Sequence, residues 1–202
     1  MIDLTELTVT GYEGETKAKV EIQTLNDAGG TEASYYWYDY TNTKGKHIIG
    51  WFDDEDELVE EGVVTFQPGE GLWVFCAADG FNLQSSGQVA TSTVVVELQK
   101  NGLSVANPTP VVADLANCII TGYEGETKAK VEIQTLNDAG GTEASYYWYD
   151  YTNTKGKHII GWFDDEDELV EEGVVTVEPG AGLWSFCAAD GFNFVWPGVD
   201  VK

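Results

Sequence analysis

Two copies of one acidic run, FDDEDELVEE at residues 52–61 and 163–172, are the densest groups of side chains that could do chemistry. Clustered carboxylates can bind Ca²⁺ through their oxygens. An EF-hand loop needs a glycine at its sixth position, however, and counting from Asp53 or Asp54 places Leu58 or Val59 there. The run therefore favours a solvated acidic loop over a defined calcium site, and we expect no metal and no other cofactor.

Residues for other kinds of catalysis are sparse. His47 and His158 occupy the same position in two copies of a repeat, and neither has a serine, cysteine or aspartate partner at a recognisable spacing. The GEG at 69–71 lacks the lysine and the helix that follow a phosphate-binding loop. We therefore predict no catalytic residues and a protein that is not an enzyme.

The cysteines form an odd set for a disulfide framework: Cys76, Cys118 and Cys187. Cys76 and Cys187 both lie in FCAADGF, inside a strand-like run, so we predict that both are buried and unpaired. The first residues include an early acid and lack the basic start and apolar run of a signal peptide. These features predict synthesis in a reducing cytoplasm without export by such a signal.

The charge excludes several classes of partner. The formal net charge is −25, and every one of the ten basic residues is a lysine. Arginine is the usual bidentate ligand of phosphates, and so negative a chain repels polyanions. Nucleic acid and anionic membranes are therefore not expected as partners, and no stretch has the length and apolarity of a membrane-spanning helix.

An internal repeat organises the chain. Residues 10–65 and 121–176 are identical at all 56 positions with a constant offset of 111. Each repeat has the size of one domain, which predicts a first domain over 1–91 and a second over 92–202. The second includes an additional opening hairpin at 92–112, in which two strand-like runs flank the turn signal Lys100-Asn101-Gly102.

Within each repeat the patterns are those of short strands. Residues 18–24, AKVEIQT, alternate apolar and polar side chains, with Val20 and Ile22 on one face. The runs VVTF at 63–66 and LWVFCAA at 72–78 flank a turn and predict another hairpin. The fold class is therefore all-β, with two tandem near-identical β-sandwich or small β-barrel domains.

The hexapeptide YYWYDY at 35–40, repeated at 146–151, places five aromatic rings in six positions. In a strand, Tyr36, Tyr38 and Tyr40 share one face and Tyr35 and Trp37 the other. Ordinary sheet packing, a protein interface and carbohydrate binding all use such rows. We assign the first row to the core and the second to the surface. The candidate interface residues are Tyr35, Trp37, Tyr146, Trp148, Val94, Val96 and Leu98.

The extra segment at 92–112 has no counterpart ahead of the first repeat, where Asp3 aligns with Asp114. If this segment supplies strands to the second unit, the first unit exposes an unpaired sheet edge. If it instead closes the first unit, the vacancy moves to the second. An open edge is a template for a strand from another chain, so we expect edge pairing with a copy of the protein or with a lattice or capsid-type protein. The alternative is a monomer, in which the nine N-terminal residues and the FVWPG tail seal their own domains.

Three stretches, VELQKNGLSVANPTPV, PGEGLWVFCAADGFNLQSSGQV and YYWYD, resemble repeated β-domain proteins encoded by gut bacteria and their phages. The resemblance covers nearly the whole chain, and its motifs are turns and strand ends. It implies a non-enzymatic structural or assembly protein: a virion decoration or fibre component, or a self-assembling surface protein in an extracellular assembly. The alternative is a carbohydrate- or host-surface-binding module that uses the Tyr/Trp rows.

Overall fold

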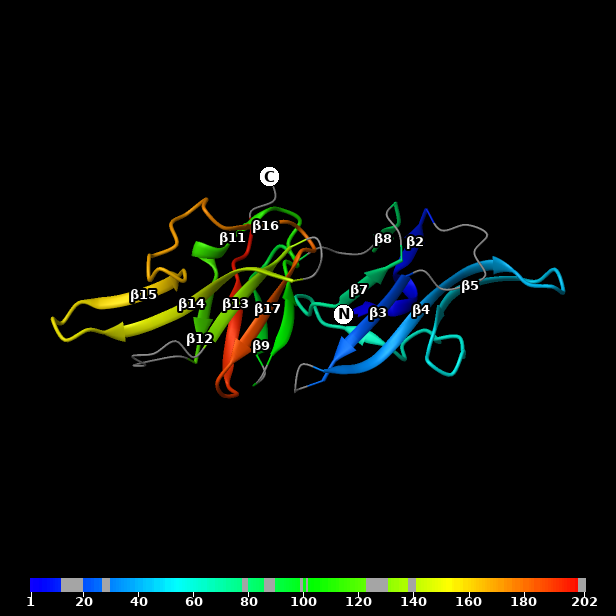
Figure 1. Ribbon diagram of the computed structural model, residues 1–202, viewed down its shortest axis with the longest axis horizontal. Helices are drawn as coiled ribbons and strands as arrows, with labels where there is room; N and C mark the ends of the chain where they lie inside the picture. Colours follow the sequence, from blue (N-terminus) through cyan, green and yellow to red (C-terminus); the bar gives the residue numbers. More distant parts are fainter. Residues whose placement is uncertain are drawn as a thin grey trace. The chain divides into compact units, whose positions relative to one another are not determined.

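The computed structural model confirms that the protein is all-β: its described residues form antiparallel sheets and two single-turn 3₁₀ helices (Figure 1). The structure describes residues 1–11, 20–26, 30–77, 80–85, 90–98, 100, 102–122, 131–137 and 141–199. Contacts between residues divide the chain into two compact units. Among the described residues, unit 1 comprises 1–11, 20–26, 30–67, 72–77 and 80–85, and unit 2 comprises 68–71, 90–98, 100, 102–122, 131–137 and 141–199.

Unit 1 contains a four-stranded sheet in the order β5-β4-β3-β7 and two smaller pairs, β2-β8 and β1-β6. Its elements are β1 (Ile2–Asp3), η1 (Leu4–Glu6), β2 (Thr8–Thr10), β3 (Val20–Leu25), β4 (Thr31–Thr41), β5 (His47–Phe52), β6 (Thr65–Phe66), β7 (Trp73–Cys76) and β8 (Asn82–Gln84). The predicted hairpin of residues 63–78 is wrong, because β6 pairs with β1 while β7 pairs with β3.

Unit 2 contains the corresponding three sheets. The counterpart of the four-stranded sheet has a fifth strand, in the order β10-β17-β13-β14-β15, and the counterpart of the β2-β8 pair has a third, in the order β12-β18-β9. The third sheet is the pair β11-β16. Its elements are β9 (Val94–Leu98), β10 (Leu103–Ala106), β11 (Ala113–Asp114), η2 (Leu115–Asn117), β12 (Ile119–Thr121), β13 (Val131–Leu136), β14 (Thr142–Thr152), β15 (His158–Phe163), β16 (Thr176–Val177), β17 (Gly182–Cys187) and β18 (Phe192–Trp196). None of the sheets formed by the described residues closes into a barrel.

The segment 92–112 forms the two predicted strands, but they do not pair with each other. β9 pairs with β18 and β10 pairs with β17, so the segment contributes one strand to each of two sheets. The predicted hairpin is therefore wrong, although the strands on either side of residues 100–102 are present; residue 101 lies outside the described part of the chain. The segment therefore completes the second unit, which is the first of the two alternatives considered for it.

The turn of residues 68–71 belongs to unit 2 by its contacts, although its sequence is part of the first repeat. Gly71 N donates a hydrogen bond to Ser104 O (2.8 Å), and Ala106 N donates one to Gly69 O (2.8 Å). Gly69 has φ +91°, and a Cβ at this position would lie 2.6 Å from Val96. A side chain is thus excluded at Gly69 both by backbone conformation and by the close approach of β9.

The alternation of residues 18–24 correctly places Val20 and Ile22 in a core, where both are buried in β3; residues 18 and 19 lie outside the described residues. The core of unit 1 also contains Trp37 and Trp51, whose rings meet edge to face with centroids 5.3 Å apart. Trp37 is opposite Trp51 in the β4–β5 ladder, so both face the same side of the sheet.

The assignment of the two aromatic faces is therefore wrong. Trp37 is 4% exposed, whereas Tyr36, Tyr38 and Tyr40 lie half-buried on the other face of β4. Trp37 and Trp51 are in register on neighbouring strands and pack on each other in the core, while the tyrosines on the other face keep their hydroxyls within reach of water. The same arrangement recurs in unit 2, where Trp148 packs on Trp162.

Candidate functional site

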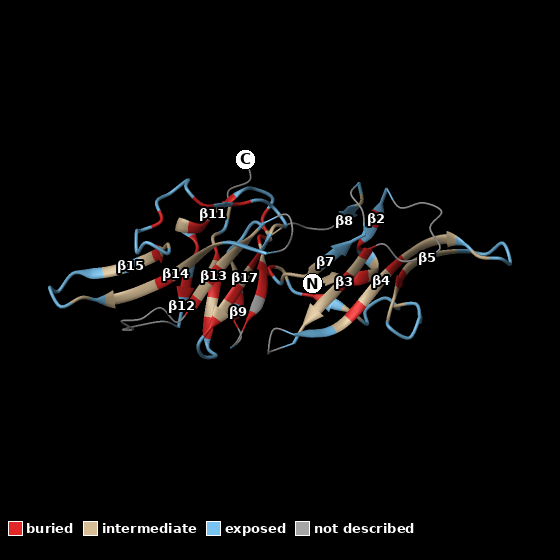
Figure 2. Ribbon diagram, in the orientation of Figure 1, coloured by how far each residue is buried: buried red, intermediate tan, exposed pale blue. Residues whose placement is uncertain are grey.

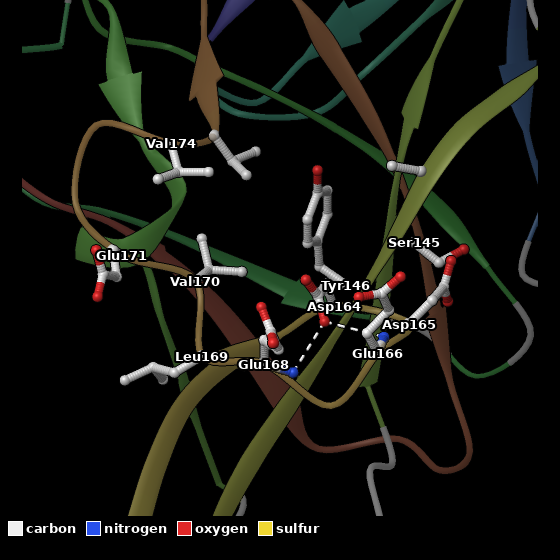
Figure 3. Close-up of a pocket in the computed structure, with 12 residues that line it drawn as sticks. Ser145, Tyr146, Asp164, Asp165, Glu166, Glu168, Leu169, Val170, Glu171 and Val174 are labelled. Carbon is white, nitrogen blue, oxygen red and sulfur yellow. Dashed lines mark hydrogen bonds between the residues drawn. The ribbon is translucent and has the colours of Figure 1, made fainter.

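The acidic runs form turns that use their own carboxylates. Asp164 accepts hydrogen bonds from the backbone N–H groups of Glu166 (3.0 Å) and Glu168 (2.9 Å), as Figure 3 shows, and Asp53 makes the same bonds in unit 1. The carboxylate that begins each run therefore caps a backbone turn. Within the described residues, no group of three or more His, Cys, Asp or Glu side chains is placed to hold a metal ion.

A cavity of 610 Å³ lies beside this loop in unit 2, between the acidic turn and strand β14 (Figure 3). Its lining combines Tyr146, Val170 and Val175 with loop carboxylates such as Asp165. The hydroxyl of Tyr147 donates a hydrogen bond to Asp165 (3.1 Å), so this carboxylate holds the loop to the sheet. These contacts explain the conformation of the acidic loop and assign it a structural role.

Each histidine contacts an aspartate on the neighbouring strand. His47 Nε2 lies 2.7 Å from Asp39 Oδ1, and His158 lies at the same distance from Asp150. The His47 side chain is 59% exposed. An exposed cross-strand pair of this kind contributes modestly to sheet pairing.

The feature that distinguishes unit 1 from unit 2 is the edge formed by β7 and β8. β7 is the last strand of its sheet and β8 pairs with β2 alone, whereas β17 and β18 each lie between two strands. The positions that β10 and β9 occupy in unit 2 have no strand in unit 1 among the described residues. Figure 2 shows β7 and β8 mostly exposed, while β17 carries buried residues.

Side chains at this edge point toward the core of unit 1 and yet are exposed. Val74 and Cys76 are opposite the buried Ile22 and Val20, and Leu83 is opposite the buried Val9. Residues that are opposite in a ladder share a face of the sheet, so these three side chains face inward. Val74 is 43% exposed and Leu83 39%, which means that the core is open along this edge.

The equivalent side chains of unit 2 are covered. Ser185 and Phe194, which correspond to Val74 and Leu83, are 0% exposed. Cys187 is 6% exposed, while the identical residue Cys76 is exposed. Because the neighbouring sequence FCAADGF is the same in both repeats, the difference comes from the β9–β10 segment (residues 92–112), which is present beside β17 and β18. We call the inward-facing residues Val74, Cys76 and Leu83 the open edge of unit 1.

The prediction of burial is therefore correct for Cys187 and wrong for Cys76. All three cysteines are free, as predicted for Cys76 and Cys187, and Cys118 and Cys187 are buried. Burial raises the pKa of Cys118 to about 12, with Asp114 adding to the effect, and burial together with Asp190 raises the pKa of Cys187 to about 12. Burial also raises the pKa of Cys76.

These differences predict one reactive thiol. Because the thiolate is the nucleophile, a thiol that is buried and has a raised pKa reacts slowly with a disulfide reagent. In native protein at pH 8, Cys76 should be labelled first, while Cys118 and Cys187 should need denaturant. Mass spectrometry of labelled peptides that contain the divergent residues around each cysteine measures this. Labelling of Cys187 as fast as that of Cys76 would contradict it.

The candidate interface residues lie in or against the cores. Trp37, Trp148, Val96 and Leu98 are buried, and Tyr35, Tyr146 and Val94 are half-buried and pack against these cores. The expectation that Tyr35 and Trp37 form an exposed row is therefore wrong, because this face of β4 is the core face. The open edge was missed as a set of residues, although the repeats differ in sequence at two of its three positions, 74 against 185 and 83 against 194.

No protein-family model, curated protein or solved structure matches the chain. Among the described residues, no helix is long and apolar enough to cross a membrane.

Proposed function

We propose that this protein is a non-enzymatic structural subunit, built from two tandem, near-identical β-sandwich domains, that assembles through the open edge of unit 1. The observation that supports this proposal is the exposure of Val74, Cys76 and Leu83, which face the core of their own unit. Its partner is a copy of the protein or a lattice or capsid-type protein, as in a virion decoration or fibre component or a self-assembling surface protein.

The physical basis is the cost of leaving such an edge in water. An edge strand presents unpaired N–H and C=O groups that another strand can satisfy. Natural edges are protected by charges, prolines or bulges, but β7 has the sequence WVFC, with no charged residue and no proline. Pairing with a partner strand would both complete this ladder and remove apolar side chains from water.

The charge of the chain sets the conditions for self-association. Thirty-five acidic residues against ten basic ones give copies of the protein the same strong negative charge. Like charges repel at low ionic strength. At 0.1 M salt, this repulsion is largely screened between charges more than about 10 Å apart. Association through an apolar edge should therefore strengthen as salt is added, in contrast to association through ion pairs.

Light scattering across protein concentrations at low and moderate salt tests the proposal, with negative-stain microscopy of the same samples. We expect the wild-type chain to self-associate increasingly with salt and Val74→Lys to stay monomeric. Val63→Lys is the matched control, because Val63 is 69% exposed in the turn before β6 and is not an open-edge residue, and it should associate like the wild type. A wild-type chain that stays monomeric at every salt concentration would contradict self-assembly.

A second candidate function is carbohydrate binding by the outer aromatic row of β4. Tyr38 packs edge to face on Tyr40 and on Phe52, with centroids 5.9 and 5.1 Å apart. These half-buried rings form an apolar surface on the outer face of the sheet, the kind that stacks on sugar rings. Changes in intrinsic fluorescence on adding oligosaccharides, lost in Tyr38→Ala with Tyr149→Ala, would favour this alternative.

A further inference from the structure

We propose that unit 1 is an acceptor for a β9–β10-type segment supplied by another polypeptide, which would place one strand beside β7 and one beside β8. This inference rests on the proposed function in that it takes the open edge as the assembly surface, and it names the occupant. The occupant is a pair of short strands joined by a turn, with apolar side chains on the core-facing positions of both.

The first support is that unit 2 already holds such a segment at the equivalent place. Val94–Leu98 pairs with Phe192–Trp196, and Leu103–Ala106 pairs with Gly182–Ser185. The strands that would receive it in unit 1, β7 and β8, pair with β3 and β2 in the same register in which β17 and β18 pair with β13 and β12. A segment of this type therefore has a demonstrated docking geometry on this scaffold.

The second support is that the segment completes the core of the unit that holds it. Val96, Leu98 and Val105 are 6%, 0% and 0% exposed and belong to the core of unit 2. They are contributed by β9 and β10, and the described buried residues that form the core of unit 1 include none of the three. The open edge thus lacks the inward-facing apolar residues that its counterpart receives from β9 and β10.

The third support concerns the cysteine pair. Lys100, between the two strands, forms an isolated parallel β-bridge with Cys187 through the backbone. Its backbone N–H also donates a hydrogen bond to Asp190 Oδ1 (2.9 Å). Lys100 therefore lies against the end of β17, at the residue that corresponds to Cys76. An occupant of unit 1 in the same register would cover Cys76, so the reactivity of this thiol reports on docking.

Differences between the repeats indicate which side chains fit best. In unit 2, Val96 is opposite Phe194, while the corresponding residue of unit 1 is the smaller Leu83. The space next to Leu83 favours an occupant with a larger apolar residue than valine opposite it. The preferred partner of unit 1 is therefore a related segment with a bulkier residue at this position.

The test uses the full-length protein and a synthetic peptide of residues 92–112, at a concentration and low salt where scattering shows monomers. The readout is the rate at which a disulfide reagent labels Cys76. Labelling of a covered thiol requires local opening, so saturating peptide should slow the reaction at least about tenfold. The same peptide with Val96→Phe should protect at lower concentration, and a control peptide with Leu98→Asp and Val105→Asp should not protect.

The outcomes separate this inference from the proposed function. If neither the wild-type nor the Val96→Phe peptide slows the labelling of Cys76, the acceptor inference is wrong, even if the chain self-associates through Val74. Faster labelling of Cys187 without protection of Cys76 would overturn it as well, because the peptide would then be exchanging with the segment of unit 2. Protection of Cys76 in a chain that never self-associates would support the acceptor and contradict self-assembly.

A fusion provides the second measurement. A second copy of residues 92–112 placed directly before Ile2 reproduces the connection that unit 2 has at Ala113. If unit 1 accepts the segment, Cys76 in this fusion should become as unreactive as Cys187, and a higher melting temperature should accompany the protection. A fusion in which Cys76 stays reactive would overturn the inference.

Discussion

Replacing Trp37 with alanine should destabilise unit 1 by about 3–5 kcal/mol, the range for removing a buried tryptophan. Trp37 is 4% exposed and packs edge to face on Trp51, which is 2% exposed. The substitution removes one partner of this pair and leaves a cavity in the core of unit 1 that the surrounding side chains fill only in part. Urea unfolding of the full chain, monitored by circular dichroism, should show the loss as an earlier transition of unit 1.

Two control variants make this prediction specific. Tyr38→Ala alters the next residue of the same strand but on the outer face, so its cost should be clearly smaller. Trp37→Phe should cost less than Trp51→Phe, because Trp51 Nε1 donates a hydrogen bond to Leu7 O (2.8 Å), whereas the indole N–H of Trp37 has no partner among the described residues. A cost for Tyr38→Ala equal to that of Trp37→Ala would contradict the assignment of faces.

The sequence predicts the strands better than their faces, and β4 shows why. In residues 18–24, apolar and polar side chains alternate, so only one face can be buried, and the placement of Val20 and Ile22 follows. In YYWYDY both faces carry aromatic rings, and the alternation no longer distinguishes them. The decision comes from Trp51 on β5, which pairs with Trp37 across a register that local sequence does not reveal.

The β9–β10 segment shows a second limit. Its Asn-Gly turn signal correctly predicts two strands, but the signal assumes that the strands pair with each other. Their true partners, β18 and β17, lie more than seventy residues further along the chain. Cys76 and Cys187 were predicted alike because their local sequences are identical, and they differ because only one has this segment as a neighbour. The open edge therefore depends on long-range pairing.

Replacing Leu98 with alanine should make unit 2 resemble unit 1. Leu98 is 0% exposed in the core of unit 2 and is opposite Phe192 in the β9–β18 pair. Removing its side chain should destabilise unit 2 by about 2–5 kcal/mol, because the transfer energy is lost and a cavity remains. Much of this loss should appear as easier detachment of β9, since Leu98 is the most deeply buried residue of that strand.

The measurement is the labelling rate of Cys187 in native protein. If detachment of the segment exposes this thiol, a loss of 2 kcal/mol raises its reactivity roughly thirtyfold, since each 1.4 kcal/mol is a factor of ten. Val95→Ala is the matched control, because Val95 lies in the same strand but is 58% exposed, and it should leave Cys187 protected. If Leu98→Ala destabilises the protein but Cys187 becomes reactive only on global unfolding, the segment is an inseparable part of unit 2. The contrast between Cys76 and Cys187 would then not arise from a detachable cover.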